Sequence, residues 1–280
     1  MYLREITKRS RMLLICACAM AIFCVSSGDL SPLAFAAESH PEKTVAGYLL
    51  SEELPNSLFL LPPPPSAESD AFSLDKAVSR MSLKLRGTPR WMLAIEDANL
   101  NFPQAAGAFS CAVNAPITEQ ETPRLYRLLQ RVLIDAGRST GEAKNHYRRT
   151  RPFVVNKMPT CTPDEEKRIA LNGSYPSGHT TAGWTWALIL SEIAPDRFDA
   201  ILARGRAFGE SRMICNVHWQ SDVVEGRFMG AATVARLHAN PAFRADLDAA
   251  RSELAVIRSK GLKPVRDCAA ESKAMAKQLE

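Results

Sequence analysis

The chain has 280 residues, of which 46% are apolar, and its 35 Lys and Arg against 30 Asp and Glu give a formal net charge of +5. These values are ordinary for a globular protein, and so small and dispersed a charge excludes a dedicated nucleic-acid binder. After residue 36 no apolar run is longer than the segment from Ala182 to Leu190. We therefore expect no membrane-spanning helix in the mature protein.

The first 36 residues differ from the rest of the chain. A basic stretch from Met1 to Met12 precedes an apolar run from Leu13 to Val25, and small residues follow at Ala34 and Ala36. This order is typical of a secretory signal peptide. A membrane anchor is the alternative, but a spanning helix needs about 20 apolar residues and this run is shorter. We expect residues 1–36 to be a cleaved signal peptide and the protein to be secreted.

Signal cleavage would leave four cysteines, which are Cys111, Cys161, Cys215 and Cys268. In an oxidising compartment they permit three fully paired connectivities. A zinc site is disfavoured because no two of the four are spaced as in a CxxC pair.

The mature chain is expected to begin with an extended N-terminal arm over 37–70, in which Pro62 to Pro65 favour polyproline conformation. Apolar residues then recur every three or four positions, which predicts helices. The expected helices are Ala71–Arg86, Arg90–Asn99, Pro123–Arg149, Ser177–Ile193, Arg197–Met213, Ser221–His238 and Pro241–Ser259. The predicted fold is an all-α, single-domain helical bundle over 71–260, followed by a C-terminal tail over 261–280.

A first segment with chemical character runs from Lys144 to Pro152 and is rich in cations. Lys144 and Arg151 are seven residues apart, nearly two helical turns, so we expect them on one face of a helix. Pro152 disfavours helical conformation at Arg151, so that helix should end there. In the alternative interpretation these residues only complement the helix dipole, with Arg148 and Arg149 simply solvated.

A second segment, Gly173 to Thr181, contains Ser177-Gly178-His179 at the start of an apolar helix. Unpaired backbone N–H groups and the positive end of the helix dipole make such a helix start an anion site. His179, in the first turn, would lie beside the anion. Ser177 also suits an N-cap, worth about 1 kcal/mol, and the two roles are compatible.

A third segment contains Arg212, His218 and Asp222. The four-residue spacing lets the Asp222 carboxylate accept the Nδ1 proton of His218, which fixes the tautomer and makes Nε2 the nucleophilic atom. Alternatively, Asp222 only caps the following helix together with Glu225.

Together the three segments supply what a tetrahedral phosphoryl group needs, namely fixed cations, backbone donors, a nucleophile and an acid for the leaving group. The candidate phosphate-binding residues are Lys144, Arg151, Ser177, Gly178 and Arg212, and the candidate catalytic residues are His218, His179 and Asp222. His40, His146 and His238 are expected to be surface or helix residues.

The motifs KxxxxxxRP, PSGH and SRxxxxxHxxxD, in this order, resemble the signature of the superfamily that contains type 2 phosphatidic acid phosphatases, bacterial class A non-specific acid phosphatases and vanadium haloperoxidases. The resemblance to class A covers about Tyr48 to Ile257. Further matching segments are Leu61-Pro-Pro-Pro-Pro, Asp97-Ala-Asn-Leu, Pro116-Ile-Thr-Glu, Asn172-Gly-Ser-Tyr-Pro-Ser-Gly-His, His218-Trp-Gln-Ser-Asp and Asn240-Pro-Ala-Phe.

The resemblance implies an all-α periplasmic acid phosphatase that acts on small-molecule phosphomonoesters, needs no metal or other cofactor, and is usually a homo-oligomer. It implies that His218 attacks phosphorus to form a phosphohistidine while Asp222 holds its tautomer. Protonated His179 would serve the leaving group and then activate water. Phosphotransfer to alcohols and the identity of the physiological substrate stay open.

Two further expectations follow from the same resemblance. Cys161 and Cys215 match cysteines of the family, which implies a Cys161–Cys215 disulfide and leaves Cys111 to pair with Cys268. Asn216 and Val217 stand where the family commonly has Gly-Tyr, which bears on pocket shape.

Three other functions share parts of this pattern. A lipid phosphatase of this superfamily would normally carry several spanning helices. A vanadium haloperoxidase would use the same pocket and oxidise bromide or chloride with peroxide. A non-catalytic phosphate-binding protein would need the cations but neither His179 nor His218.

Overall fold

The computed structural model describes residues 45–276, so the expected signal peptide lies outside the described residues. Every regular element in this range is helical, which confirms the all-α prediction. The elements are η1 (Ser51–Glu53), α1 (Ser57–Leu60), α2 (Asp70–Leu83), α3 (Pro89–Asp97), η2 (Gln104–Phe109), α4 (Ser110–Val113), α5 (Pro123–Arg138), α6 (Gly141–Tyr147), α7 (Pro152–Asn156), η3 (Pro163–Glu165), α8 (Glu166–Ala170), α9 (Gly178–Ile193), η4 (Pro195–Arg197), α10 (Phe198–Ile214), α11 (Gln220–Leu237), α12 (Pro241–Ser259) and α13 (Cys268–Met275).

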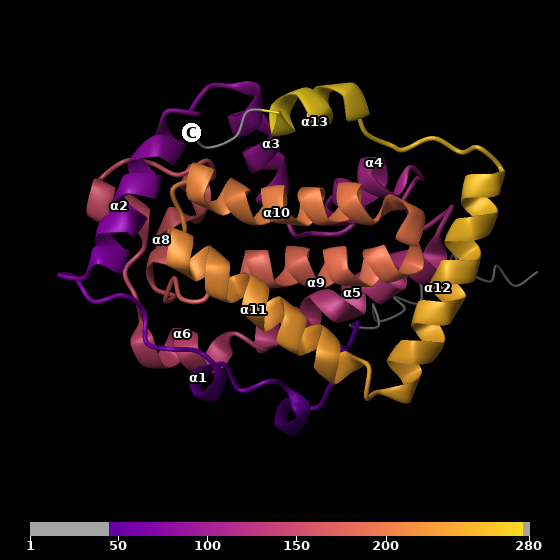
Figure 1. The fold of residues 1–280 in the computed structure, drawn as a ribbon, viewed down its shortest axis with the longest axis horizontal. Helices are drawn as coiled ribbons and strands as arrows, with labels where there is room; N and C mark the ends of the chain where they lie inside the picture. The colour runs from indigo at the N-terminus through magenta and orange to yellow at the C-terminus, as the bar shows by residue number, and fades with distance from the viewer. Residues whose placement is uncertain (1–44, 277–280) are drawn as a thin grey trace, which may run out of the picture. The chain divides into compact units, whose positions relative to one another are not determined.

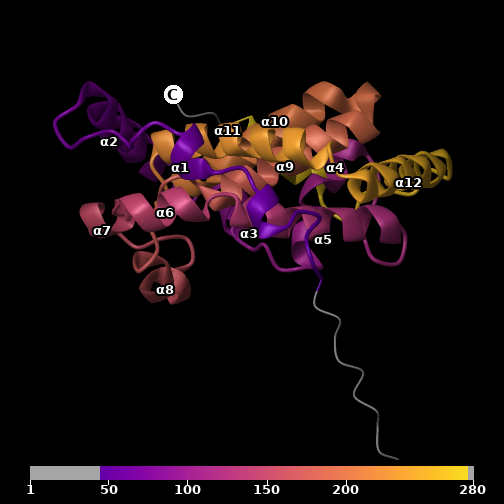
Figure 2. The ribbon, with the colours of Figure 1, turned by 90° about the horizontal axis from the view of Figure 1, so that it is seen from below.

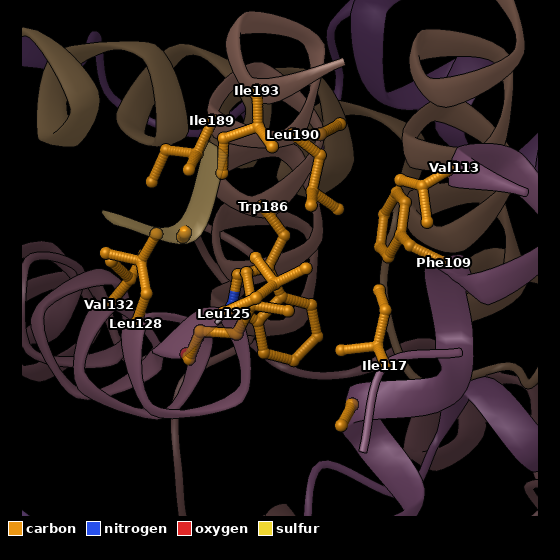
Figure 3. Close-up of a cluster of buried hydrophobic side chains, with 14 of the residues drawn as sticks. Phe109, Val113, Ile117, Leu125, Leu128, Val132, Trp186, Ile189, Leu190 and Ile193 are labelled. Atoms are coloured by element: carbon orange, nitrogen blue, oxygen red, sulfur yellow. Dashed lines mark hydrogen bonds between the residues drawn. The ribbon is translucent and has the colours of Figure 1, made fainter. Parts of the chain in front are cut away.

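Helix α9 is the centre of the bundle. It lies beside α10, while α11 crosses it obliquely and α5 packs against it from another side (Figure 1). Buried apolar side chains of α5 and α9, with those of η2 and α4, form the main core around Trp186 (Figure 3). Trp186 also donates its indole N–H to the Leu129 carbonyl at 3.0 Å, so the polar atom of this buried ring is satisfied.

One end of the bundle collects segments that are distant in the sequence. Here α9 and α11 begin and α10 ends, and α6, α7 and α8 are grouped at the same end as α2 (Figures 1 and 2). This is the end at which the three chemically distinctive sequence segments meet.

The prediction of a single helix over Pro123–Arg149 is wrong, because α5 ends at Arg138 and a separate helix, α6, begins at Gly141. The hydroxyls of Ser139 and Thr140 donate to the backbone carbonyls of Ala136 and Gly137, both at 2.9 Å. Such side-chain bonds compete with helix continuation, so the chain turns here.

Lys144 and Arg151 consequently do not share a helix face. Helix α6 ends at Tyr147 because Arg148 adopts the left-handed conformation, with φ of 43°. Arg151 itself is extended, as Pro152 predicts, and stands directly before α7.

The arm and the tail both contain helical turns. In the described part of the arm, Asn56 accepts hydrogen bonds from the N–H groups of Leu58 and Phe59, and this cap supports α1 inside a segment expected to be extended. In the tail, α13 starts at Cys268 and packs on α3.

Both expected disulfides are confirmed, since Cys111 is bonded to Cys268 and Cys161 to Cys215. Among residues 45–276, no helix combines the length and the apolar character needed to cross a bilayer.

Candidate active site

Lys144 and Arg151 converge on the loop that precedes α9, although they lie on different elements. The Lys144 ammonium donates to the Gly173 carbonyl at 2.9 Å, and an Arg151 guanidinium nitrogen lies 3.4 Å from the same oxygen. Gly173 permits this close approach, because a Cβ there would lie 2.5 Å from the Lys144 carbonyl oxygen. The two cations are therefore brought together by tertiary packing and not by helical spacing.

His218 occupies the short turn between α10 and α11 and is buried, with 4% of its surface exposed. Its Nδ1 lies 3.2 Å from the Asp222 carboxylate, and its Nε2 lies 3.1 Å from an Arg151 N–H donor. Because Arg151 can only donate, the Nε2 atom is the acceptor and the imidazole proton resides on Nδ1. This is the tautomer that the sequence predicts for a nucleophilic histidine.

Asp222 combines the two interpretations considered for it. One of its carboxylate oxygens accepts the Trp219 backbone N–H at 2.8 Å, as a helix-capping residue does, and the same oxygen faces His218. The cap therefore fixes the carboxylate that orients the imidazole. Glu225 takes no part in this cap.

Ser177 is the N-cap of α9, since its hydroxyl accepts the Thr180 backbone N–H at 3.3 Å. Its own N–H donates to the Asp222 carbonyl at 2.9 Å, which ties the start of α9 to that of α11. Gly226 lets the helices approach, because a Cβ there would lie 2.7 Å from the Ser177 carbonyl oxygen. Gly178 comes next, and a Cβ built on it would lie 3.8 Å from Cε of Lys144.

His179 is oriented by the backbone at the end of α3. Its Nε2 lies 2.9 Å from the Ala98 carbonyl oxygen, which can only accept, so Nε2 carries a proton and Nδ1 is the remaining ring nitrogen. Burial, reinforced by the Arg212 cation, holds the pKa of His179 well below its usual value. With these neighbours alone, the neutral form of His179 is favoured.

Arg212 is the clearest sign of an anion site. Only 3% of its surface is exposed, yet neither its Nε nor one of its terminal nitrogens donates to any of residues 45–276. A buried guanidinium without acceptors is costly, and an anion is the partner that removes this cost. Burial, together with nearby Arg151, lowers the pKa of Arg212 to about 10, so the group stays charged.

The crowding of cations also affects Lys144 and His218. Burial, with a contribution from Arg151, lowers the pKa of Lys144 to about 7. Burial and then the charges of Arg151, Lys144 and Arg212 hold the pKa of His218 well below its usual value. A neutral His218 among cations is suited to attack an electrophile that arrives with negative charge.

A buried polar cluster behind the site was not predicted from the sequence. Arg204 of α10 pairs with Asp97 at the end of α3, and the Ser211 hydroxyl donates to Asp97 at 2.6 Å. Arg90 donates to the Ser211 oxygen at 2.9 Å. These contacts hold α3 against α10 and so place the Ala98 carbonyl that orients His179; the helical periodicity of α3 gives no sign of them.

The alternative interpretation, in which Arg148 and Arg149 are both solvated, is wrong for Arg149. Arg148 is exposed, whereas the Arg149 side chain is 8% exposed and pairs with the carboxylates of Asp75 and Asp222. Of the other histidines, His146 is exposed, His238 is partly buried beside Glu192, and His40 lies outside the described residues.

Asn216 explains why the turn before His218 tolerates the departure from Gly-Tyr. Its φ is 60°, in the left-handed region that glycine and asparagine adopt most readily. Its side chain also bonds to Asn156 at 2.8 Å and to the Met158 carbonyl at 2.9 Å.

Comparison with known proteins shows the family of the chain. Residues 128–245 match the model of the PAP2 superfamily. The non-specific acid phosphatase of Salmonella typhimurium is 44% identical over 213 residues, which is 76% of this chain and 85% of that protein. The non-specific acid phosphatase of Providencia stuartii is 44% identical over 75% of this chain and 86% of its own length. The acid phosphatase of Zymomonas mobilis is 36% identical, with 89% and 93% covered.

The chain thus belongs to the PAP2 superfamily and, within it, to the non-specific acid phosphatases. This membership confirms the family resemblance drawn from the motifs and the expectation that the chain is an acid phosphatase.

Proposed function

We propose that this acid phosphatase hydrolyses small phosphomonoesters in two steps, through a phosphohistidine formed on Nε2 of His218. The observation that carries the proposal is the contact of Arg151 with Nε2. It leaves Nε2 unprotonated, in a pocket where the charge of the buried Arg212 acts on His218 and where Nε and one terminal nitrogen of Arg212 have no partner among residues 45–276. The proposed nucleophile and the proposed oxyanion-binding cations therefore share one pocket.

In the first step, the Arg151 N–H that contacts Nε2 turns to a phosphoryl oxygen, the freed Nε2 lone pair forms a bond to phosphorus, and the bond from phosphorus to the leaving oxygen breaks. Arg151, Arg212 and Lys144, with backbone N–H groups at the start of α9, hold the non-bridging oxygens. Protonated His179 gives its proton to the leaving oxygen, so that an alcohol departs. Asp222 stabilises the positive charge that develops on the His218 ring.

In the second step, neutral His179 takes a proton from water while the water oxygen bonds to phosphorus. The phosphorus–nitrogen bond breaks, its electron pair returns to Nε2, and inorganic phosphate leaves. An alcohol in place of water would give phosphotransfer by the same route.

The protonated state of His179 depends on the substrate. With the neighbouring groups of the chain alone, its low pKa favours the neutral form, mainly because of burial and Arg212. A phosphoryl group beside it supplies negative charge that raises this pKa, and a substrate monoanion also brings a proton. We therefore propose that the acid is charged only in the complex, which favours turnover on the acid side of neutrality.

The chain's own cations do the work that a metal ion does in other phosphatases, so we propose that the reaction needs no metal. We further propose that the protein is exported to the periplasm. Two disulfides support an oxidising compartment, and the basic, apolar and small-residue order of residues 1–36 supports a signal peptide. Assembly into a homo-oligomer is proposed from the family resemblance.

The test is turnover of p-nitrophenyl phosphate by the His218→Asn variant, with EDTA present throughout. We expect turnover to be lost, while inorganic phosphate still binds because Lys144, Arg151 and Arg212 remain. His238→Asn is the matched control, since His238 pairs with Glu192 away from the site. Substantial turnover by His218→Asn, or activity that EDTA removes and Mg²⁺ or Zn²⁺ restores, would overturn the mechanism.

A further inference from the structure

Arg149 is a buried cation that the proposed reaction does not use. One terminal nitrogen of Arg149 donates to the Asp222 carboxylate at 2.6 Å, and the other donates to the Asp75 carboxylate at 2.7 Å. The exposed fractions of these side chains are 8% for Arg149, 2% for Asp75 and none for Asp222. An ion triad so well shielded from water is formed only where its geometry is closely satisfied.

The triad is fixed from all sides. Asp75 comes from α2 and accepts both the backbone N–H and the hydroxyl of Ser221, at 2.8 and 2.6 Å. Arg149 also donates to the Ser221 hydroxyl at 2.7 Å. The rings of Phe72 and Trp219 each lie 5.7 Å from the guanidinium carbon of Arg149. Helix α2 is thereby docked on the start of α11, directly behind the residues proposed to react.

The contacts of Asp222 are divided between its two oxygens. Oδ2 faces the His218 ring and the Trp219 N–H, whereas Oδ1 faces Arg149. Without Arg149, Oδ1 would lose its charged donor, and the plane of the carboxylate would be held through Oδ2 alone. The direction of the His218 ring depends on this plane, because Nδ1 is its attachment point.

The charges of the triad also matter. Arg149 alone would neutralise Asp222 and weaken its attraction for a positively charged His218. Asp75 contributes a second carboxylate, so the triad keeps a net charge of −1. This negative charge faces a pocket in which Arg151, Lys144 and Arg212 all oppose protonation of His218.

We propose that Arg149, held by Asp75, is a positioning residue for the reaction: it fixes the plane and the effective charge of Asp222, and through Asp222 it aims Nε2 of His218 at phosphorus. The inference rests on the proposed function. It assigns to Asp75 and Arg149 a role that neither the family motifs nor the phosphate-binding groups contain.

The two residues should shift the pH profile in opposite directions. Besides Asp222, the groups that face His218 are the three cations and His179. Arg149→Met leaves two buried carboxylates and no cation between them, which raises the pKa of His218. The acid limb of kcat/KM then moves to higher pH. Asp75→Asn leaves Arg149 incompletely balanced, which lowers that pKa and moves the acid limb to lower pH.

The experiment measures kcat and KM for p-nitrophenyl phosphate in Arg149→Met, Arg149→Lys and Asp75→Asn from about pH 3 to 8, because the pKa of His218 is held well below the usual imidazole value of about 6.5. We expect Arg149→Met to lower kcat about 10- to 100-fold, by analogy with the loss seen when a hydrogen-bonded partner behind a metal-ligating imidazole is removed. KM should change by less than about threefold, because the phosphate ligands are untouched. Arg149→Lys should lower kcat less and shift the acid limb of kcat/KM less. Lysine keeps the positive charge but lacks the planar guanidinium that bonds both carboxylates at once.

Arg148→Met is the matched control, because Arg148 is the neighbouring exposed arginine. The inference is overturned if the acid limb of kcat/KM lies at the same pH in all three variants as in Arg148→Met. This holds even if their activity falls because less of the protein is folded. Asp75→Asn and Arg149→Lys preserve side-chain size, so they keep the test decisive if Arg149→Met does not fold. If His218→Asn retains turnover, the proposed function itself fails; if His218→Asn is inactive and the limbs do not move, only this inference fails.

Discussion

Removal of the Cys161–Cys215 bridge should lower both stability and turnover. The bridge closes a segment with a sequence separation of 54 residues. In the loop-entropy model such a cross-link contributes about 4 kcal/mol to the free energy of unfolding. At roughly 2–4 °C per kcal/mol for a domain of this size, the Cys161→Ala/Cys215→Ala variant should melt about 8–16 °C lower.

The effect on turnover follows from where Cys215 lies. It is the C-cap of α10, between Arg212 and His218, and it is fully buried. The bridge thus anchors the turn that aims the proposed nucleophile. A misplacement of about 1 Å in an active site costs up to about 100-fold, so we expect kcat to fall about 10- to 100-fold.

The assay compares melting temperature and kcat, at a temperature where the variants are folded, with those of Cys111→Ala/Cys268→Ala. That control removes the Cys111–Cys268 disulfide, whose sequence separation is 157 residues. In the same model this bond contributes about 5 kcal/mol to the free energy of unfolding. This bridge joins α4 to α13, and neither helix carries a proposed site residue, so its removal should lower stability with little change in kcat. Equal loss of kcat in the two variants, or an unchanged melting temperature in the first, would refute the reasoning.

Three further predictions concern the phosphate pocket. His179→Ala should slow an alkyl phosphate about 10²- to 10⁴-fold more than p-nitrophenyl phosphate, because only the alkoxide needs a proton to leave; equal slowing would exclude the acid role. Because the pKa of Lys144 is lowered to about 7, its charge is present below that pH and lost above it. Inhibition by sulfate, which does not titrate here, should therefore weaken as the pH rises through 7, and Lys144→Met should remove this dependence; a Lys144→Met profile identical to wild type would contradict the assignment. Gly173→Ala places a Cβ 2.5 Å from the Lys144 carbonyl, so it should cost about 1–3 kcal/mol in urea unfolding and raise KM; an unchanged KM would show that the loop does not position the pocket.

Much of the bundle follows from local rules. Apolar spacing locates α9 to α12, and Ser177 marks the start of α9 because its hydroxyl caps the helix. The motif residues are recognisable by their chemistry as well as by their spacing. An imidazole four residues from a carboxylate predicts a hydrogen-bonded pair, and Nδ1 of His218 lies 3.2 Å from the Asp222 carboxylate.

Other features depend on contacts that local rules do not contain. The break after Arg138 comes from hydroxyls at Ser139 and Thr140 that turn back onto the helix, while the apolar period continues through it. Arg148 and Arg149 are identical side chains in adjacent positions, and only the second meets Asp75, which lies 74 residues away in sequence. The low pKa of His179 likewise results from burial and from the nearby charge of Arg212, and the order of residues in the sequence predicts neither.

The covalent intermediate is the central claim and can be measured directly. A single turnover of substrate labelled in its phosphoryl group is quenched with alkali, because phosphohistidine is stable to base and labile to acid. The account predicts a labelled peptide that contains His218, and no label in His218→Asn. The contrary result is complete turnover of the substrate by the wild-type enzyme with no base-stable label on the protein at any quench time. It would show that water attacks phosphorus directly, and it would contradict the account.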